Sequence, residues 1–165
     1  MEGKGRITGH TGLLALIGSP VGHSGSPAMY NYSFEKLGLD YAYVAFDIKV
    51  EEVKAALDAM RLFHMRGCNV TMPCKTEAAK YMDELSPAAR IIGAVNTIVN
   101  EDGKLIGHMT DGEGFVGNLR DHGIEIKGKK ITVAGGGGAA TAIQVQCALD
   151  GAREISIFNI KDDFF

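Results

Sequence analysis

The sequence predicts an α/β fold with a mainly parallel sheet, because segments with strand periodicity and segments with helix periodicity alternate along it. Residues 13–17 are a continuous apolar run that is typical of a strand buried on both faces, and residues 41–46 form a second strand-like run. Apolar residues recur at helical spacing over residues 50–63. In such sheets ligands bind beyond the carboxyl ends of the strands, so we expect the functional residues there.

The composition is that of a soluble α/β protein with an excess of glycine. Of the 165 residues 45% are hydrophobic and 22% charged, and the 22 glycines require turns or close ligand approach. A formal net charge of −3 without a basic run argues against nucleic acid as a partner. The five histidines and three cysteines lack metal-ligand spacing, so we expect no metal. With neither a signal-peptide pattern nor a membrane-spanning apolar run, we expect a cytoplasmic protein outside the membrane.

Two serines follow the first predicted strand. Ser26 before Pro27 is typical of a helix N-cap with proline at the first helical position. The helix is expected to bury a stripe formed by Met29, Phe34 and Leu37. The hydroxyls of Ser24 and Ser26, together with the free amides of the helix start, form a neutral receptor suited to a carboxylate. Alternatively, Ser26 only caps the helix and Ser24 only forms a turn.

The third predicted strand, residues 66–71, ends in a polar segment. Pro73 stops the strand ladder because proline lacks an amide donor and fixes φ. Lys75 is therefore expected at the strand end, beside Asn69 and Thr71, whose polar groups can orient a polyol. The alternative is a solvated lysine that begins a helix.

Cys74 is a less favoured candidate. The ammonium of the neighbouring Lys75 is expected to lower the pKa of its thiol. A catalytic cysteine also needs a histidine base close by, so we assign no catalysis to it.

Two short helices, residues 77–85 and 87–92, and a β-hairpin are predicted next. The hairpin strands, residues 94–100 and 104–109, flank a Glu-Asp-Gly turn signal. Asp111 comes directly after the hairpin and before a further amphipathic helix. It is predicted either to cap that helix or to serve as a functional acid.

A glycine-rich turn follows the polar boundary around Gly128. Strands are predicted at residues 130–134 and 154–158, with a helix at residues 141–149 between them. Strand, glycine turn, helix and strand make the first βαβ unit of a Rossmann-type domain, in which glycines let the backbone approach a pyrophosphate. A plain tight turn is the alternative. The candidate cofactor residues of the turn are Gly135, Gly137, Gly138 and Ala139.

The residues after the last predicted strand bear on the choice of cofactor. Asp162 stands about 20 residues beyond the glycines, where an acid accepts hydrogen bonds from a ribose 2′-hydroxyl and repels a 2′-phosphate. The cofactor is therefore expected to be NAD or NADP, with NAD favoured. Lys161 would relax that preference, and a solvated acidic turn is the alternative.

Two domains are expected. Residues 1–128 are predicted to form a substrate-binding and catalytic domain, and residues 129–165 the first βαβ unit of an NAD(P)-binding domain. Because a nucleotide-binding domain needs about 100 residues or more, we interpret the chain as part of a longer enzyme.

Five motifs, in this order, resemble those of shikimate dehydrogenases. They are the segments 22–27, 69–75, 93–97, 110–114 and 135–139. The closing stretch, residues 158–165, is most similar to the quinate/shikimate dehydrogenase branch, which accepts NAD as well as NADP. Position 109 is Met where the family usually has Asn, and position 160 is Ile where an Arg that favours NADP is common.

The resemblance implies a reversible hydride transfer between C3 of shikimate or quinate and C4 of a nicotinamide, in aromatic amino acid biosynthesis (the chorismate pathway) or in quinate metabolism. It implies that Lys75 and Asp111 are the catalytic pair of a monomer or homodimer. The implied substrate residues are Ser24, Ser26, Tyr43, Asn69, Thr71 and Asn96, and Asn159, Lys161 and Asp162 join the glycine turn at the cofactor. The alternatives are a module that binds a hydroxy acid without turnover, and an unrelated regulator with a structural glycine turn.

Overall fold

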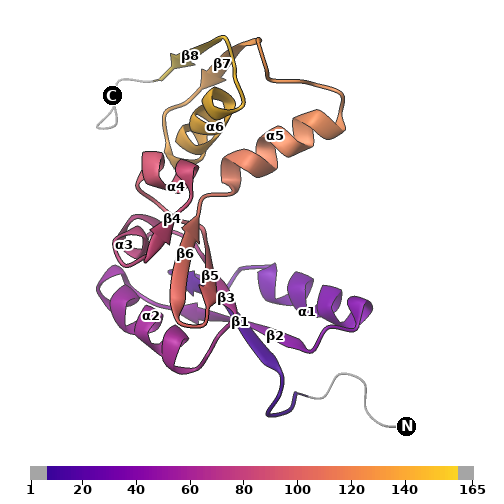
Figure 1. Cartoon of the computed structure of the whole chain (residues 1–165), viewed down its shortest axis with the longest axis vertical. Coiled ribbons are helices and arrows are strands. Elements are labelled where there is room, and N and C mark those ends of the chain that lie inside the picture. Colours follow the sequence, from indigo (N-terminus) through magenta and orange to yellow (C-terminus); the bar gives the residue numbers. More distant parts are fainter. Residues whose placement is uncertain (1–6, 160–165) are drawn as a thin grey trace. The chain divides into compact units, whose positions relative to one another are not determined.

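The computed structural model describes residues 7–159, which form two compact units. The first unit contains the described residues up to Glu84 together with Ala94–Gly107, and the second contains Leu85–Gly93 and the described residues from His108 onward (Figure 1). The domain boundary predicted between residues 128 and 129 refers to a complete protein and stays a prediction. The α/β fold class is confirmed.

A six-stranded sheet in the order β2-β1-β3-β5-β6-β4 organises the first unit. Its strands are β1 (Gly12–Gly18), β2 (Tyr41–Asp47), β3 (Gly67–Val70), β4 (Glu84–Leu85), β5 (Thr97–Glu101) and β6 (Lys104–His108). The predicted parallel pairing is confirmed for the first three strands, because β1 runs parallel to both β2 and β3. The hairpin is confirmed as well, and its first strand, β5, runs antiparallel to β3.

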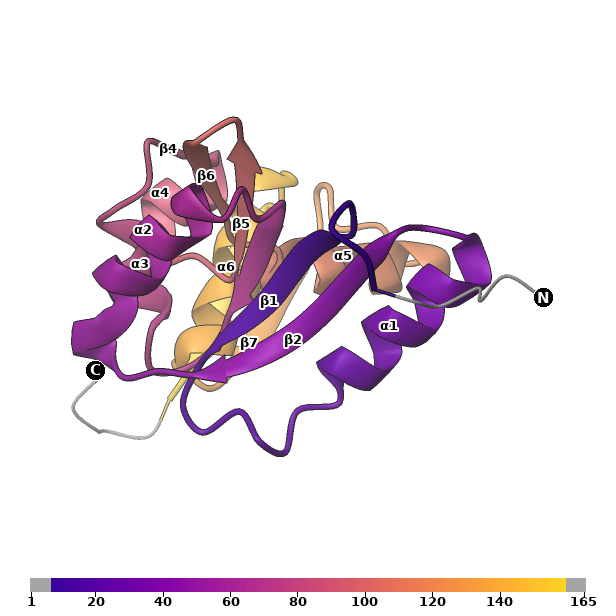
Figure 2. The ribbon, with the colours of Figure 1, turned by 90° about the horizontal axis from the view of Figure 1, so that it is seen from below.

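The helices of the first unit cover both faces of the sheet. They are α1 (Ser26–Leu37), the short 3₁₀ helix η1 (Val50–Glu52), α2 (Val53–Leu62) and α3 (Lys75–Ala79). Figure 2 shows α1 and α2 on opposite sides of β1 and β2. This explains the continuous apolar run of β1, in which Leu14 and Leu16 pack with α1 whereas Leu13 and Ile17 face α2.

The predicted stripe of α1 is wrong at two of its three positions. Met29 is 56% exposed and Leu37 is 71% exposed, and Phe34 packs on the core together with Tyr30 instead. This face of α1 covers Leu16, Val21 and Tyr43, and the ring of Tyr43 stacks on that of Tyr30.

The helix predicted at residues 77–85 is also wrong in its extent. α3 begins at Lys75 and ends at Ala79, and the following residues lead into β4. The amide of Asp83 donates to the carbonyl of Leu105, and the amide of Leu105 donates to the Asp83 carboxylate. Pairing with a distant strand therefore prevails over local helix propensity here.

The second unit contains the predicted βαβ arrangement, which is confirmed. Its elements are α4 (Pro87–Ile92), α5 (Asp111–Asp121), β7 (Lys130–Ala134), α6 (Gly138–Leu149) and β8 (Glu154–Phe158). β7 and β8 pair in parallel, and α6 begins three residues before the predicted helix start. Val116, Ile126 and Cys147 form the buried core under α5 and α6. Among the described residues, no helix is both long and apolar enough to cross a membrane.

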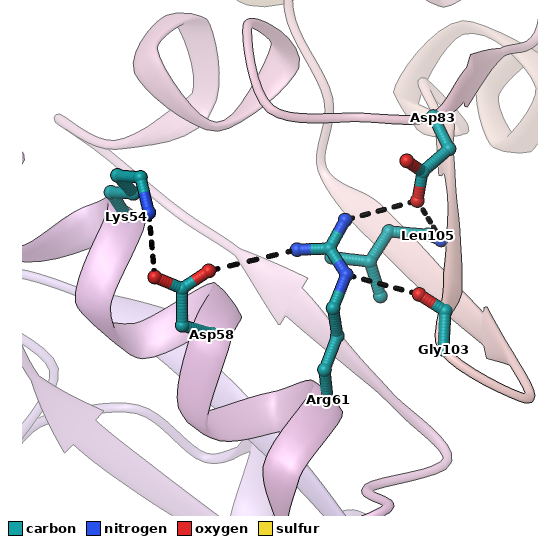
Figure 3. A network of polar contacts seen from close by, with 6 residues as sticks. All are labelled: Lys54, Asp58, Arg61, Asp83, Gly103 and Leu105. Atoms are coloured by element: carbon teal, nitrogen blue, oxygen red, sulfur yellow. Dashed lines mark hydrogen bonds and ion pairs between the residues drawn. The ribbon is translucent and has the colours of Figure 1, made fainter.

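A polar network ties α2 to the hairpin of the first unit (Figure 3). Arg61 donates to the carbonyl of Gly103 (3.0 Å) and to the carboxylate of Asp83 (3.0 Å). The amide of Leu105, and after it Arg61, lower the pKa of Asp83 by hydrogen bonding to its carboxylate. Because the pKa is lowered, this stabilisation is complete above the ordinary carboxyl pKa of 3.8 and is lost as the pH falls through the lowered value.

Replacing Arg61 by alanine is expected to lower the free energy of unfolding by about 1–2 kcal/mol, since hydrogen bonds to charged groups contribute more than exposed ion pairs. Lys54→Ala is the control, because Lys54 is 63% exposed and makes an ion pair with Asp58 within the same helix. Its effect should stay within about 0.5 kcal/mol. Urea unfolding followed by circular dichroism measures both, and equal effects would contradict the role given to Arg61.

Candidate active site

The segments that follow β1, β2 and β3 are joined at the carboxyl ends of these strands. The amide of Ser19 donates to the carbonyl of Met72 (3.0 Å), and the amide of Ile48 donates to the carbonyl of Gly18 (3.0 Å). Gly18 has a φ of +148°, and a Cβ there would lie 2.5 Å from Cγ2 of Thr71. A glycine is required for this approach, which brings the serine loop beside the segment that ends at Lys75.

Asn69 is held by hydrogen bonds on both sides of its side-chain amide. Its Nδ2 donates to Oγ1 of Thr97 (3.2 Å) and to the carbonyl of Asn96 (3.5 Å). Because a carbonyl can only accept, the end of the Asn69 amide on this side must be the nitrogen. Its Oδ1 therefore faces Tyr43, whose hydroxyl donates to it (2.8 Å). Burial, and next the neighbouring Tyr30, raise the pKa of Tyr43 well above its ordinary value, so this hydroxyl stays protonated. Asn69 is thus presented in one orientation.

Tyr43 is itself fixed by α1. Its ring stacks on Tyr30 with centroids 4.5 Å apart. The side-chain amide of Asn31 accepts from the amide of Tyr43 (2.9 Å) and donates to its carbonyl (2.8 Å). Asn31 thereby pairs with the edge of β2 as a neighbouring strand would. Neither Tyr30 nor Asn31 was predicted, because no local pattern distinguishes them from other polar or aromatic helix residues.

The serine loop differs from its prediction. Ser26 is the first residue of α1, and the cap position belongs to Gly25, with no side-chain cap hydrogen bond. Ser24 Oγ accepts from the amide of Ser26 (3.2 Å). The predicted capping role of Ser26 is therefore wrong, and the hydroxyl of Ser24 forms the turn before the helix.

Lys75 is the first residue of α3 and is half-buried. Its carbonyl accepts from the amide of Val95 (3.0 Å), and the amide of Val70 donates to the carbonyl of Asn96 (2.8 Å). The loop before β5 therefore runs alongside the segment after β3. This brings together, within the first unit, four of the predicted site residues: Asn69, Thr71, Lys75 and Asn96.

Cys74 is fully buried, and its Sγ lies 3.7 Å from the carbonyl of Ile48. Burial, followed by the charges of Glu51 and Glu52, raises the pKa of this thiol. The expectation that Lys75 lowers it is wrong, and a buried thiol with a raised pKa is a poor nucleophile.

Asp111 is the first residue of α5, in the second unit, and is half-buried. The cap position belongs to Thr110, so the predicted capping role of Asp111 is wrong. The preceding Met109 is buried. Because Lys75 and Asp111 belong to different units, their pairing stays a prediction.

The glycine-rich turn is anchored to α6 by its carbonyl groups. Oγ1 of Thr141 donates to the carbonyl of Gly137 (3.2 Å), and Nε2 of Gln144 donates to the carbonyl of Gly135 (3.3 Å). Gly135 has a φ of +116°, which favours glycine. A Cβ at Gly136 would lie 2.6 Å from Nδ2 of Asn159. Thr141, Gln144 and Gly136 were not predicted, although hydroxyl and amide groups in the first two turns of α6 were visible in the sequence.

The start of α6 suits an anionic group. Gly137 occupies its cap position in an extended conformation, and no side-chain cap hydrogen bond forms there. A Cβ at Gly137 or Gly138 would meet nothing within 4 Å, and Ala139 is exposed. The backbone can therefore approach a pyrophosphate, which is the fit that a dinucleotide requires. Lys161 and Asp162, like Ile160, lie outside the described residues.

Clusters of three or more histidine, cysteine, aspartate or glutamate side chains able to hold a metal are absent from residues 7–159.

These features define an α/β protein in which a sheet with three parallel strands, and with polar groups gathered at the ends of those strands, precedes the first βαβ unit of a Rossmann-type domain. Residues 16–98 match the family described as the shikimate dehydrogenase substrate binding domain, and the chain belongs to this family.

Relatives and solved structures agree with this assignment. A curated shikimate dehydrogenase (NADP(+)) from Listeria monocytogenes is 57% identical over 160 residues, which cover 97% of this chain and 55% of the relative. The crystal structure of shikimate 5-dehydrogenase from Listeria monocytogenes in complex with shikimate and NAD has a TM-score of 0.94 at 57% identity. The match covers 97% of this chain and 55% of that one. A ligand-free 5-ketofructose reductase of Gluconobacter has a TM-score of 0.87 at 34% identity. That match covers 91% of this chain and 54% of the reductase. The chain spans about half the length of the proteins it matches.

Tyr43→Phe is expected to lower the free energy of unfolding by about 1 kcal/mol, because Oδ1 of Asn69 loses its donor. Tyr32→Phe is the matched control, since Tyr32 lies on α1 and is 62% exposed. Denaturant unfolding of both variants measures the difference. An unchanged stability of Tyr43→Phe would show that its hydroxyl does not hold Asn69.

Proposed function

We propose that the complete protein containing this chain is a shikimate dehydrogenase that interconverts 3-dehydroshikimate and shikimate with a nicotinamide cofactor. The observation that carries the proposal is the similarity, over 97% of the chain, to an enzyme whose structure contains shikimate and NAD. Quinate, oxidised to 3-dehydroquinate, is the second candidate substrate. The proposal places the enzyme in the cytoplasm as a monomer or homodimer.

The polar groups at the strand ends provide the substrate site in this proposal. Ser24 and Ser26, on the loop after β1, bind the carboxylate. Asn69, Thr71 and Asn96 bind ring hydroxyls. This assignment is supported by the backbone hydrogen bonds that join the segments after β1 and β3. Tyr43 acts through Asn69, because its buried hydroxyl is used in that hydrogen bond.

Lys75 and Asp111 carry the proton chemistry. Oxidation of an alcohol requires the hydroxyl proton to leave as the hydride leaves, and Lys75 accepts that proton at Nζ when its amine is neutral. Asp111 either shares in the proton transfer or orients Lys75 and the substrate. The nicotinamide supplies the hydride acceptor when it is bound.

The start of α6 and the turn before it bind the cofactor. Amides at Gly137, Gly138 and Ala139 face the pyrophosphate, and the positive φ of Gly135 shapes the turn. Asn159, Lys161 and Asp162 are assigned to the adenine ribose of the cofactor in this proposal, as the sequence resemblance implies. NAD is the favoured cofactor because of the acid at position 162, whereas the curated relative is named for NADP(+).

Lys75→Ala in the complete protein is expected to lower kcat for shikimate oxidation at least about 10²-fold, the lower range for general acid–base groups. Lys80→Ala is the control, because Lys80 is exposed and forms an ion pair with Glu77, three residues earlier in the chain. The rate of NADH formation measures both. Undiminished activity of Lys75→Ala would refute the assignment of the proton transfer.

Thermal stabilisation of the unaltered complete protein by shikimate, without NADH or NADPH formation, would instead support the module that binds a hydroxy acid without turnover.

Asp162→Ser is expected to raise the kcat/KM ratio of NADP to NAD by about tenfold, because a 2′-phosphate no longer meets a negative charge. Asp150→Ser is the charge-matched control, since Asp150 follows α6 and interacts with Arg120 and Gln146. Steady-state kinetics with both cofactors measures the ratio. A ratio that is the same in the Asp162 variant and the unaltered protein would show that this acid does not select the cofactor.

A further inference from the structure

Gly112 of α5 packs directly against the backbone of α6. It is the second residue of α5 and is buried. A Cβ built there would overlap the carbonyl oxygen of Ala142 and would lie 2.7 Å from Cβ of Gln146. Side chains do not pack this closely, so the spacing of the two helices requires glycine at this position.

This contact links two candidate functional segments of the second unit, Asp111 at the start of α5 and the glycine-rich turn before α6. Asp111 directly precedes Gly112, and Ala142 stands four residues, about 6 Å along the helix, after Gly138. We propose that Gly112 is a positioning residue that sets the location of Asp111 relative to the glycine-rich turn. The inference rests on the proposed function, because it assumes that Asp111 and the turn serve one reaction.

The remaining contacts between these helices make the position of Asp111 sensitive to Gly112. Val116, in the middle of α5, and Cys147, in the last turn of α6, are buried in the same core. Arg120 and Asp150 form an ion pair (3.4 Å) near the opposite ends of the helices. Figure 1 shows α5 and α6 side by side. A side chain at position 112 would therefore push the start of α5, where Asp111 lies, away from α6 and so change the position of Asp111 relative to the glycine turn that precedes α6.

The other glycines of α5 provide the contrast. A Cβ at Gly114 or Gly117 would meet nothing within 4 Å. Alanine is the better helix former at an unobstructed position, so these two sites should accept it. Gly112 is the α5 glycine at which the added methyl group must move a neighbouring helix.

The test compares Gly112→Ala with Gly114→Ala in the complete protein. Gly112→Ala is expected to lower kcat about 10²-fold, because a displacement of about 1 Å from the reacting geometry has that effect. The dissociation constant of shikimate should change much less than kcat, because the proposed carboxylate and ring-hydroxyl contacts of Ser24, Ser26, Asn69, Thr71 and Asn96 lie in the first unit and Asp111 adds at most one contact to them. Gly114→Ala should keep its kcat and raise the melting temperature. An unchanged kcat of Gly112→Ala would overturn the inference.

Val116→Ala separates positioning from simple loss of stability. It truncates a buried side chain between the same helices without inserting a group, so the melting temperature should fall while kcat is retained. A loss of kcat in Val116→Ala as large as that in Gly112→Ala, at a similar melting temperature, would show that Gly112 is merely structural.

A second variant pair covers the case in which Gly112→Ala does not fold. Gln146→Val adds a branch at the Cβ that faces Gly112, whereas Gln146→Leu is unbranched there. Both lose the hydrogen bond to Asp150. A lower kcat in Gln146→Val than in Gln146→Leu supports the inference, and equal kcat values in the two variants overturn it. Failure of the proposed function would be recognised separately, as absence of shikimate oxidation by the unaltered protein.

Discussion

The parallel pairing of β1 with both β2 and β3 is the constraint on which the candidate site depends. Three strands that run in one direction end at one edge of the sheet, and the segments that follow them must share that edge. Gly18 allows the chain to turn there beside Thr71, where a side chain would not fit. The serine loop and the segment ending at Lys75 are thereby joined by backbone hydrogen bonds, although about fifty residues separate them in sequence.

Hydrogen bonds across the sheet then determine which groups face that edge. Asn69 is oriented by Tyr43 on one side and by Thr97 and Asn96 on the other. Tyr43 is fixed in turn by Asn31 of α1, which pairs with its backbone. The helix that begins at the serine loop is therefore also the helix that, through Tyr43, holds the side-chain amide of Asn69 in place.

Features with local causes could be predicted from the sequence, and features set by distant contacts could not. The apolar run of β1, the Glu-Asp-Gly hairpin and the strand, glycine turn and helix at residues 130–149 follow from periodicity and turn chemistry, and the structure confirms them. The helix expected at residues 77–85 is wrong because Asp83 pairs with Leu105. The role of Tyr43, and the requirement for glycine at position 112, depend on neighbours that are remote in sequence.

If the strand-end groups bind shikimate for oxidation, the complete protein must oxidise shikimate with a nicotinamide cofactor. The measurement is the absorbance of NADH or NADPH at increasing concentrations of shikimate, with quinate assayed in parallel. Saturable formation of reduced cofactor with shikimate is the predicted result. Binding of shikimate without formation of either reduced cofactor would show that the strand-end groups hold shikimate but do not present it for oxidation.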